Sequence, residues 1–462
     1  MHAAAWIVLA SGLLAQGEVV EPPGVLVARL GAASYAERER AAAVLERLGR
    51  DALPALRGAE RSRDLEIRTR AAAILHRIEA ALLVRPTMVR LDFRDQPRSR
   101  ILAELSRQTG FRLELSAPQA AGADEPRATL VHPEPLPFWK AIDEFCLATG
   151  LNYDPEPLGL AVGGEPTLTF SDQIRRPLDP TSDHGPFRVS VVGLQFLHDV
   201  RFAILEPPGD GGPEDKRPLL APPPDRFSLR PKPVMSEQCW VRFRITAEPR
   251  LAISQIGPLR LLQARDDRGS SLREETADAL VWNSTIGVLG ASCDTALHLQ
   301  EPIRRPPIPG TTITILQGTV PLKISSRRPD PLVVPLPTAQ GRSFRKGATR
   351  IVIHAVPAGD PRHGHLELTL ETEASGDPTP PLDAPPPNFA TAADSLHRRL
   401  EIVDAKGRPL SWIQTAEDLD TGRLTLSLNG PATESLPHEL HYYELAETVL
   451  DLPFTFTDLP MP

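Results

Sequence analysis

Residues 88–115 read MVRLDFRDQPRSRILAELSRQTGFRLEL, and residues 128–155 read ATLVHPEPLPFWKAIDEFCLATGLNYDP. The second stretch repeats the pattern of the first at an offset of 40 positions. The matching pairs are Pro97 with Pro137, Glu104 with Glu144, Thr109 with Thr149, and Gly110 with Gly150. Such a repeat predicts two copies of one structural unit, and the rest of the chain is interpreted around it.

Each copy predicts a strand, a helix and a second strand. In the first copy, apolar residues alternate with polar ones from Val89 to Phe93, which is typical of a half-buried strand. Pro97 opens a helix, and Gly110 stands where a left-handed cap ends it. Two such units in tandem predict a β-α-β-β-α-β domain over residues 86–165, with both helices on one face of the sheet.

The repeated pattern of a strand, P-x-x-x-[IA]-[LI]-x-E-[LF]-x-x-x-T-G and a strand resembles the short N-terminal domain of secretins and TonB-dependent receptors. The resemblance covers residues 86–165 of the 462 in the chain. It implies a periplasmic fold that binds proteins or stacks between subunits. Downstream of residue 165 there is neither a series of amphipathic membrane strands nor a secretin pore domain. The channel function of those families is therefore not expected here.

A helical unit is predicted before this domain, over residues 24–85. Ser34 and Asp64 are placed to cap two helices, each of which has an apolar stripe. Between them, Pro54 suits the first turn of a short helix, and Gly49 ends the helix before it. The order of helix, short helix and helix resembles a HEAT or armadillo repeat. One repeat cannot bury its own apolar face, so we expect this unit to dock on a neighbour or to cap it.

The remainder of the chain predicts two antiparallel β-sandwich-like domains, over residues 186–340 and 341–462. Short runs with a period of two recur in both, separated by turn residues. Residues 163–186 are predicted to be a linker, and residues 207–233, with nine prolines, a long loop. The stretches LRLLQARDDRGSSL (259–272) and LEIVDAKGRPL (400–410) share a strand, a charged turn and a return strand. The whole fold class is thus multidomain α+β.

Composition and the first residues indicate the compartment. Residues 3–15 form an apolar run that is too short to span a bilayer and fits a signal peptide, here placed at residues 1–17. A disordered start is the alternative, because no Lys or Arg precedes the run. The chain has 51 basic and 59 acidic residues, a net charge of −8, which argues against nucleic acid or an anionic membrane as partner. An exported, periplasmic or extracellular protein is expected.

Three cysteines are present, and their spacing is not that of a zinc site. Cys146 lies on the apolar side of a predicted helix and is expected to be buried. Cys239 and Cys293 both lie in the β-rich region, so in an exported protein they are candidates for a disulfide.

Candidate chemical groups were compared with simpler structural interpretations. His363 with His365, and His438 with His441, are too few for a metal site by themselves. The acidic residues lie in turn-like sequence, where Asp is favoured for local hydrogen bonding, and these are Asp266, Asp267, Glu417, Asp418 and Asp420. Residues 290–293 (GASC) lack the G-x-S-x-G arrangement of a nucleophile elbow. No catalytic, cofactor-binding or metal residue is predicted, and no enzyme.

The predicted function is a non-enzymatic exported envelope protein that mediates protein–protein interaction or structural scaffolding, with an unidentified envelope protein as partner. Trp139 lies off the apolar stripe of its helix, so Trp139 and Lys140 are the candidate contact residues. Packing of Trp139 against the helical unit is the alternative. A cell-wall or carbohydrate-binding protein is the second hypothesis, although the chain has only five Trp and four Tyr. A hydrolase whose site forms from His363, His365, His438 and Asp420 is the third.

Overall fold

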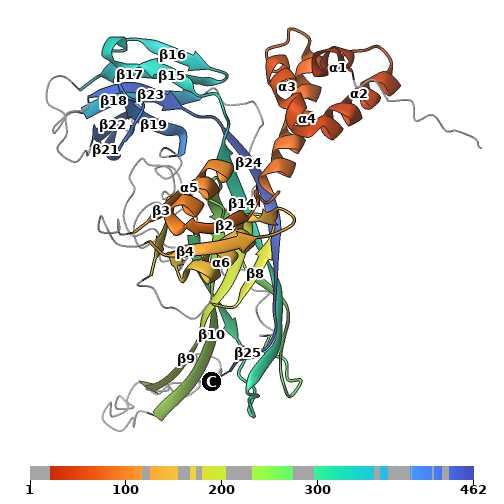
Figure 1. The fold of residues 1–462 in the computed structure, drawn as a ribbon, viewed down its shortest axis with the longest axis vertical. Helices are drawn as coiled ribbons and strands as arrows, with labels where there is room; N and C mark the ends of the chain where they lie inside the picture. The colour runs from red at the N-terminus through yellow and green to blue at the C-terminus, as the bar shows by residue number, and fades with distance from the viewer. Residues whose placement is uncertain are drawn as a thin grey trace, which may run out of the picture. The chain divides into compact units, whose positions relative to one another are not determined.

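The computed structural model describes residues 21–116, 125–154, 167–172, 179–203, 232–273, 296–357, 365–372, 396, 398–418, 421–428 and 436–461. The fold is mixed and mostly β, with several antiparallel sheets (Figure 1). The chain divides into two compact units, Met1–Leu82 and Leu83–Pro462. The expected signal peptide lies outside the described residues.

The first unit is helical, and its helices share one apolar core. They are α1 (Pro23–Arg29), α2 (Tyr35–Leu48), a 3-10 turn (Gly49–Ala52), α3 (Leu53–Ala59) and α4 (Leu65–Leu83). Gly49 ends α2, and Asp64 caps α4 through bonds that its Oδ1 accepts from the N–H groups of Glu66 (2.9 Å) and Ile67 (3.3 Å), as predicted. Ser34 precedes α2, but its side chain makes no capping bond. Whether this unit belongs to the HEAT class stays a prediction.

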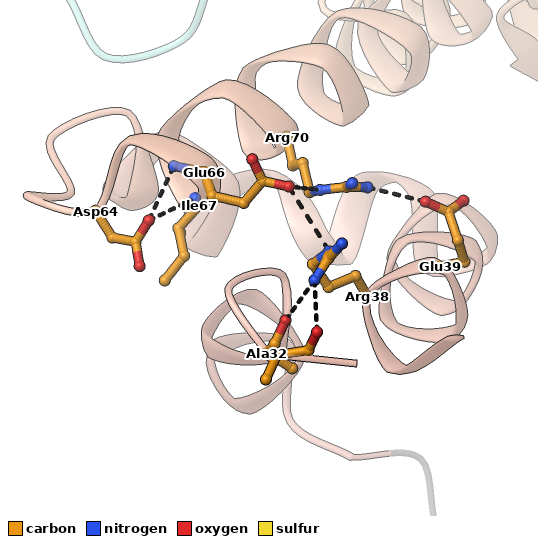
Figure 2. A network of polar contacts seen from close by, with 8 residues as sticks. Ala32, Arg38, Glu39, Asp64, Glu66, Ile67 and Arg70 are labelled. Carbon is orange, nitrogen blue, oxygen red and sulfur yellow. Dashed lines mark hydrogen bonds and ion pairs between the residues drawn. The ribbon is translucent and has the colours of Figure 1, made fainter. Parts of the chain in front are cut away.

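Arginines join the helices of this unit at their polar rim (Figure 2). Arg70 of α4 donates to Glu66 on its own helix at 2.5 Å and to Glu39 of α2 at 2.9 Å. Arg38 of α2 reaches back to the carbonyl of Ala32, at 2.7 Å, in the turn after α1. The first two helices and α4 are thus tied together outside the apolar core.

The αβ domain of the second unit shows how the two sequence copies combine. Its strands are β1 (Met88–Val89), β2 (Asp92–Pro97), β3 (Arg112–Leu115), β4 (Arg127–Val131), β5 (Leu136–Pro137), β6 (Asn152–Asp154) and β7 (Thr167–Ser171). β1 of the first copy pairs with β5 of the second, and β2 of the first pairs with β4 of the second. Each copy therefore completes the other, and neither can form these ladders alone.

The two helices of the αβ domain are α5 (Arg98–Thr109) and α6 (Phe138–Thr149). They begin and end at equivalent positions of the two sequence copies. Pro97 and Pro137 precede them with nearly the same backbone angles. Gly110 (φ 73°) and Gly150 (φ 69°) end them in the left-handed conformation, as predicted. Both helices bury most of their apolar residues in one core with the strands.

The predicted linker over residues 163–186 is wrong where the structure describes it. β7 lies between β3 and β6, parallel to β3 and antiparallel to β6. Phe170 and Leu168 of β7 are buried in the core of the αβ domain. Residues 181–184 also form a strand, β8 (Thr181–His184). The prolines and glycines around these strands concealed them in the sequence.

The first sandwich is formed by two sheets that share one core. One sheet has the order β13-β10-β9-β8, with β9 (Phe187–Ala203), β10 (Lys232–Ala247) and β13 (Ala296–Ile303). The other contains β11 (Ala252–Ile256), β12 (Arg260–Asp266), β14 (Thr312–Arg327), β24 (Leu445–Phe456) and β25 (Leu459–Pro460). Apolar residues of both sheets meet in a single cluster that includes Phe243, Leu316 and Phe454.

The second sandwich is formed by residues between β14 and β24. One sheet has the order β15-β23-β19-β20, with β15 (Leu332–Pro335), β19 (Leu400–Asp404), β20 (Pro409–Leu410) and β23 (Pro437–Tyr442). The other has the order β16-β17-β18-β22-β21, with β16 (Ser343–Lys346), β17 (Thr349–Ala355), β18 (His365–Thr372), β21 (Trp412–Asp418) and β22 (Arg423–Leu428). Their shared core includes Trp412, Leu426 and Tyr442.

The two sandwiches share most of their strand order, and β21 of the second has no counterpart among the described strands of the first. Strands β8, β9, β10 and β13 are neighbours in one sheet, as are β16, β17, β18 and β22 in the other sandwich. In the facing sheets, β12-β14-β24 corresponds to β19-β23-β15. The corresponding strands β15 and β24 differ in their position along the chain. β15 precedes the other strands of its sandwich, whereas β24 follows the whole second sandwich. The predicted boundary at residue 341 therefore differs from the strand pairing, because β24 completes the first sandwich.

The shared stretches 259–272 and 400–410 form the same turn. Asp266 Oδ1 accepts bonds from the N–H groups of Arg268 and Ser270, and Asp404 Oδ1 accepts from those of Lys406 and Arg408. Both aspartates are buried, at 1 % and 4 % exposure. The local motif seen in the sequence is thus a structural repeat at corresponding places, after β12 and after β19.

Candidate functional site: the junction around Arg188

Arg188 is the centre of a buried polar cluster where the αβ domain meets the first sandwich. It lies at the start of β9, and Asp183 lies on the neighbouring strand β8. Asp143 and Trp139 come from α6, and Tyr153 comes from β6. We call these five residues the Arg188 junction. The strand places Arg188 on the face opposite Phe187 and Val189, which enter the sandwich core.

The guanidinium of Arg188 is held by two carboxylates and a hydroxyl. Nε and Nη2 donate to Asp183, both at 2.7 Å, while Nη1 and Nη2 donate to Asp143 at 2.6 and 2.5 Å. Nη1 also donates to Tyr153 Oη at 3.1 Å. These bonds match the five N–H donors of a guanidinium. Paired contacts of this kind fix direction as well as distance, so they set the angle between α6 and the β8–β9 hairpin.

Trp139 lies inside this junction and is only 2 % exposed. The Arg188 guanidinium carbon stands 5.3 Å from the centre of its ring, within the range of a cation–π contact. Its indole Nε1 donates to the carbonyl of Pro186 at 3.0 Å. The expectation that Trp139 is exposed is therefore wrong, because the side of α6 outside the helix's own apolar stripe is covered by the β8–β9 hairpin. Lys140 is exposed.

Burial and ion pairing act in opposite directions on the junction's charge. Burial lowers the pKa of Arg188, but the hydrogen bonds that it donates to Asp183 and Asp143 more than offset this effect, so its pKa is raised above the ordinary value. Burial also raises the pKa of Tyr153, against the effect of the Arg188 charge. The guanidinium is therefore permanently charged and the phenol stays neutral at physiological pH. Two carboxylates beside one guanidinium give the cluster a formal charge of −1.

A second group of contacts joins the same two domains near Glu248, which is fully buried. Its carboxylate accepts bonds from the N–H of Thr87 at 2.8 Å and from the Thr87 hydroxyl at 2.6 Å. Arg250 donates to the same carboxylate at 3.0 Å and also to the Arg85 carbonyl. The N–H of Glu248 donates to the Pro186 carbonyl, the acceptor that Trp139 also uses. The entry to the αβ domain is thereby bound to the turn after β10.

Gly185 closes the junction at the β8–β9 turn. It has a φ of 57°, and a Cβ there would stand 2.6 Å from the carbonyl oxygen of Val84. A side chain is excluded both by the backbone conformation and by this close approach. The turn therefore presses directly against the segment that enters the αβ domain.

The Arg188 junction has a structural role, because its hydrogen bonds connect two domains. A guanidinium whose donors are all engaged has none left to polarise a substrate, and an arginine does not exchange protons at physiological pH. The cluster instead holds α6, β6 and the β8–β9 hairpin in one arrangement.

The histidines singled out in the sequence are not brought together where they are described. His365 lies on β18 and His438 on β23, in different sheets of the second sandwich, and both are exposed. His441 contacts Glu439 at 2.8 Å. His363 and Asp420 lie outside the described residues. Among the described residues there is no group of three or more His, Cys, Asp or Glu side chains placed to hold a metal ion.

The acidic candidates of the first sandwich hold backbone in place. Asp266 accepts bonds from its own turn and from the N–H of Gly310 at 3.1 Å. Asp267 accepts bonds from the N–H and the hydroxyl of Thr311, and these lower its pKa. In the second sandwich, Glu417 and Asp418 end the exposed edge of β21. The sequence interpretation of these groups as turn-forming residues agrees with the two aspartates of the first sandwich.

The described cysteines are buried thiols. Burial raises the pKa of Cys146 to about 12 and that of Cys239 to about 11. Cys293 and the rest of residues 290–293 lie outside the described residues. Of the described tryptophans, Trp139 and Trp412 are enclosed in cores and Trp240 is half-buried.

Sequence reasoning missed Arg188, Asp183 and Glu248, because a charged residue on the outer face of a strand or in a turn is ordinarily solvated. One signal was available. Trp139 and Asp143 are four residues apart, so both lie on the same side of α6, away from its apolar stripe. An aromatic residue beside a carboxylate in this arrangement is suited to an arginine from another element.

The comparisons add no further likeness. No helix among the described residues is both long and apolar enough to cross a membrane. No family model matches the chain, and neither a curated protein nor a solved structure matches it.

Proposed function

We propose that this chain is a non-enzymatic, exported envelope protein that serves as a structural scaffold and mediates protein–protein interaction. The Arg188 junction is the main support. It holds the αβ domain to the first sandwich with a buried guanidinium, two carboxylates and a tryptophan, so the domain is presented at a fixed angle.

The second sandwich supports the same proposal. It is inserted between two strands that pair with each other, since Arg327 of β14 stands opposite Leu445 of β24. Arg398 donates to the Ser325 hydroxyl and the Ile253 carbonyl of the first sandwich, at 3.3 and 3.2 Å. Two short connections and these bonds limit rotation between the sandwiches. A scaffold benefits because each of its surfaces keeps a set spacing.

The outer face of α6 is the proposed contact surface of the αβ domain. Lys140, Glu144 and Leu147 lie at positions i, i+4 and i+7 on one side of the helix, and all three are exposed, Leu147 at 79 %. In the first copy of the repeat, the residue equivalent to Leu147 is Arg107, which pairs with Glu104 at 2.6 Å. The second copy thus has an apolar residue where the first has an ion pair. Lys140 keeps its predicted role, and Leu147 takes the place of Trp139.

Site-specific photo-crosslinking tests this surface. A photoreactive amino acid is placed at Leu147 in one variant and at Arg107 in a matched control, which lies at the same position of the other helix. Both are expressed in the source organism, exposed to light, and analysed by mass spectrometry of the covalent products. We expect one identified envelope protein to be captured from position 147 and not from position 107.

Affinity measurement with the purified captured protein completes the test. Leu147→Asp places a charge in the contact and is expected to weaken binding at least about tenfold, while Arg107→Asp leaves it unchanged. Equal capture from both positions, or equal affinity of both variants, would contradict the proposed surface. Localisation of the full chain in the cytoplasm would contradict the exported scaffold as a whole.

A further inference from the structure

The slot filled by β24 has a distinctive construction. In the second sandwich, the corresponding slot beside β23 is filled by β15, which begins that sandwich. In the first sandwich, the slot beside β14 is filled by a strand that arrives after the entire second sandwich (Figure 1). The strands from β8 to β14 therefore build a sheet that lacks one member, and β24 supplies it.

The slot is shaped for this particular strand. All twelve residues of β24 pair in register with β14, from Leu316 opposite Phe456 to Arg327 opposite Leu445. Leu452, Phe454 and Phe456 enter the core and are at most 4 % exposed. A Cβ on Gly318 would stand 2.6 Å from the Phe454 ring and 2.5 Å from the carbonyl oxygen of Arg260 on β12, so a glycine leaves room for both neighbours. Because Gly318 has no side chain, the Phe454 ring of β24 can lie against it, and this favours the observed register of the two strands.

The other wall of the slot is also built by the first sandwich. Phe243 of β10 packs against the rings of Phe454 and Phe456, with centroids 5.2 and 6.3 Å apart. Ser182 of β8 accepts a hydrogen bond from the N–H of Thr455 at 3.2 Å. The described groups named here that receive β24 all lie before residue 328. The donor strand is joined to the second sandwich by two residues only, Tyr443 and Glu444.

We infer that β24 is exchanged between two copies of this chain, so that the first sandwich of each copy is completed by the strand of the other. The slot is complementary to residues 445–456, because its register and the positions of the packed rings match those of this strand. We therefore expect the same strand of a second copy to fill it. An exchanged strand makes the same ladder and the same core contacts as the strand seen here. The equilibrium between closed and exchanged forms then depends on the contacts that hold the two-residue connection and the second sandwich in the closed arrangement, and on protein concentration.

Two charges at the connection set the conditions for exchange. Arg328 and Glu444 form an ion pair at 3.3 Å, and Arg328 also donates its N–H to the Glu444 carbonyl. These contacts favour the closed form, and each chain carries a net charge of −8 that opposes association at low salt. Added salt screens both effects. The exchanged dimer is therefore expected to increase with ionic strength.

Disulfide trapping in the full-length chain tests the exchange. Lys323 and Val449 stand opposite each other on β14 and β24 and point away from the core, with side chains 33 % and 71 % exposed. Opposite residues of an antiparallel pair are close enough for a disulfide. One chain carries Lys323→Cys and another carries Val449→Cys, both with Cys293→Ser, and they are mixed and oxidised. A covalent heterodimer forms only when the strand of one copy occupies the slot of the other.

The control replaces Val449→Cys by Thr455→Cys, which stands opposite Gln317 and so six residues out of register with position 323. We expect at least about tenfold more heterodimer from the matched pair than from the control, because pairing raises the effective concentration of the two thiols. A chain with both Lys323→Cys and Val449→Cys, oxidised when dilute, is expected to stay monomeric by light scattering and to dimerise after reduction. Equal yields from matched and control pairs would overturn the inference, as would a reduced chain that stays monomeric at high salt.

Discussion

Substitution of Arg188 by Met removes the centre of the junction while keeping much of the side-chain volume. The change leaves Asp143 and Asp183 facing each other without a cation, and it leaves Trp139 without its cation–π partner. Tyr153 also loses a hydrogen-bond donor. The αβ domain should then separate more readily from the first sandwich, while the cores of both remain as they are.

The expected loss is about 3 kcal/mol. Removing one partner of a buried ion pair costs about 3–5 kcal/mol, mainly because the remaining charge is left buried and unpaired. The lower end applies here, because Asp143 is 40 % exposed and Asp183 is 21 % exposed, so water can hydrate both after the change. Five hydrogen bonds are lost, but their values do not add, since they share one group.

Hydrogen exchange followed by mass spectrometry measures this loss locally, which matters because unfolding of several domains is not a single transition. A reduction of about 3 kcal/mol predicts about a hundredfold faster exchange in α6 and in the β8–β9 hairpin. Arg107→Met is the matched control, because Arg107 pairs with a carboxylate at the exposed surface of α5. The reasoning is refuted if Arg188→Met exchanges in α6 at the rate of the parent protein.

Three further outcomes are expected. Gly185→Ala should lower the melting temperature more than Gly110→Ala, because both glycines have positive φ but only position 185 would bring a Cβ against a backbone oxygen, at 2.6 Å from Val84; equal losses would contradict this. Cys146, with its pKa raised to about 12 by burial, should resist a thiol reagent at mildly alkaline pH until the protein is unfolded by urea, and rapid labelling of the native protein would show that the helix face is open. Asp404 has its pKa lowered to about 2, chiefly by the backbone hydrogen bond of Arg408, so its contribution to stability is present above its ordinary pKa of 3.8 and is lost as pH falls through about 2. The melting temperature of Asp404→Asn should therefore lie below that of the parent near neutral pH, with the gap closing in this acidic range, and a gap that does not depend on pH would count against the assignment.

Local signals in the sequence predicted the two helices of the αβ domain and where they end, but the predicted single sheet is wrong, because the strands form three separate ladders. The repeat at an offset of 40 places both helices, and Gly110 and Gly150 end them as expected, because caps and apolar periodicity depend on neighbours within a few residues. The repeat did not predict that strands of the first copy pair with strands of the second, because it was interpreted as two complete units. β7 was missed because its burial depends on β3 and β6, which are distant in sequence.

The β region shows where turn residues mislead. The sequence predicts two short strands, over residues 311–316 and 320–324, with Gly318 between them, yet one strand, β14, runs through both. Gly318 lies within the strand because the Phe454 ring occupies the space of its side chain, and Pro321 lies in the gap between β11 and β12, where no ladder bond from its nitrogen is needed. Neither reason can be read locally, since both arise from strands that come from elsewhere in the chain.

The candidate site was predicted only in part. Trp139 was predicted to be an exposed contact residue but is buried, because its partner Arg188 is 49 positions away and belongs to another domain. The side chain was assigned to the surface because one helix in isolation exposes it. Contacts between domains of this kind need the relative placement of the domains, which neither periodicity nor capping provides.

The insertion of the second sandwich also has a consequence for the order of folding. The second sandwich is continuous from residue 332 to residue 442, so it can close as soon as it has been synthesised. The first sandwich begins at residue 181 but must wait for residues 445–456. During synthesis, and during any passage through a membrane, its apolar slot is open and the chain is a substrate for chaperones. The earlier sandwich in the sequence is thus the later one to become native.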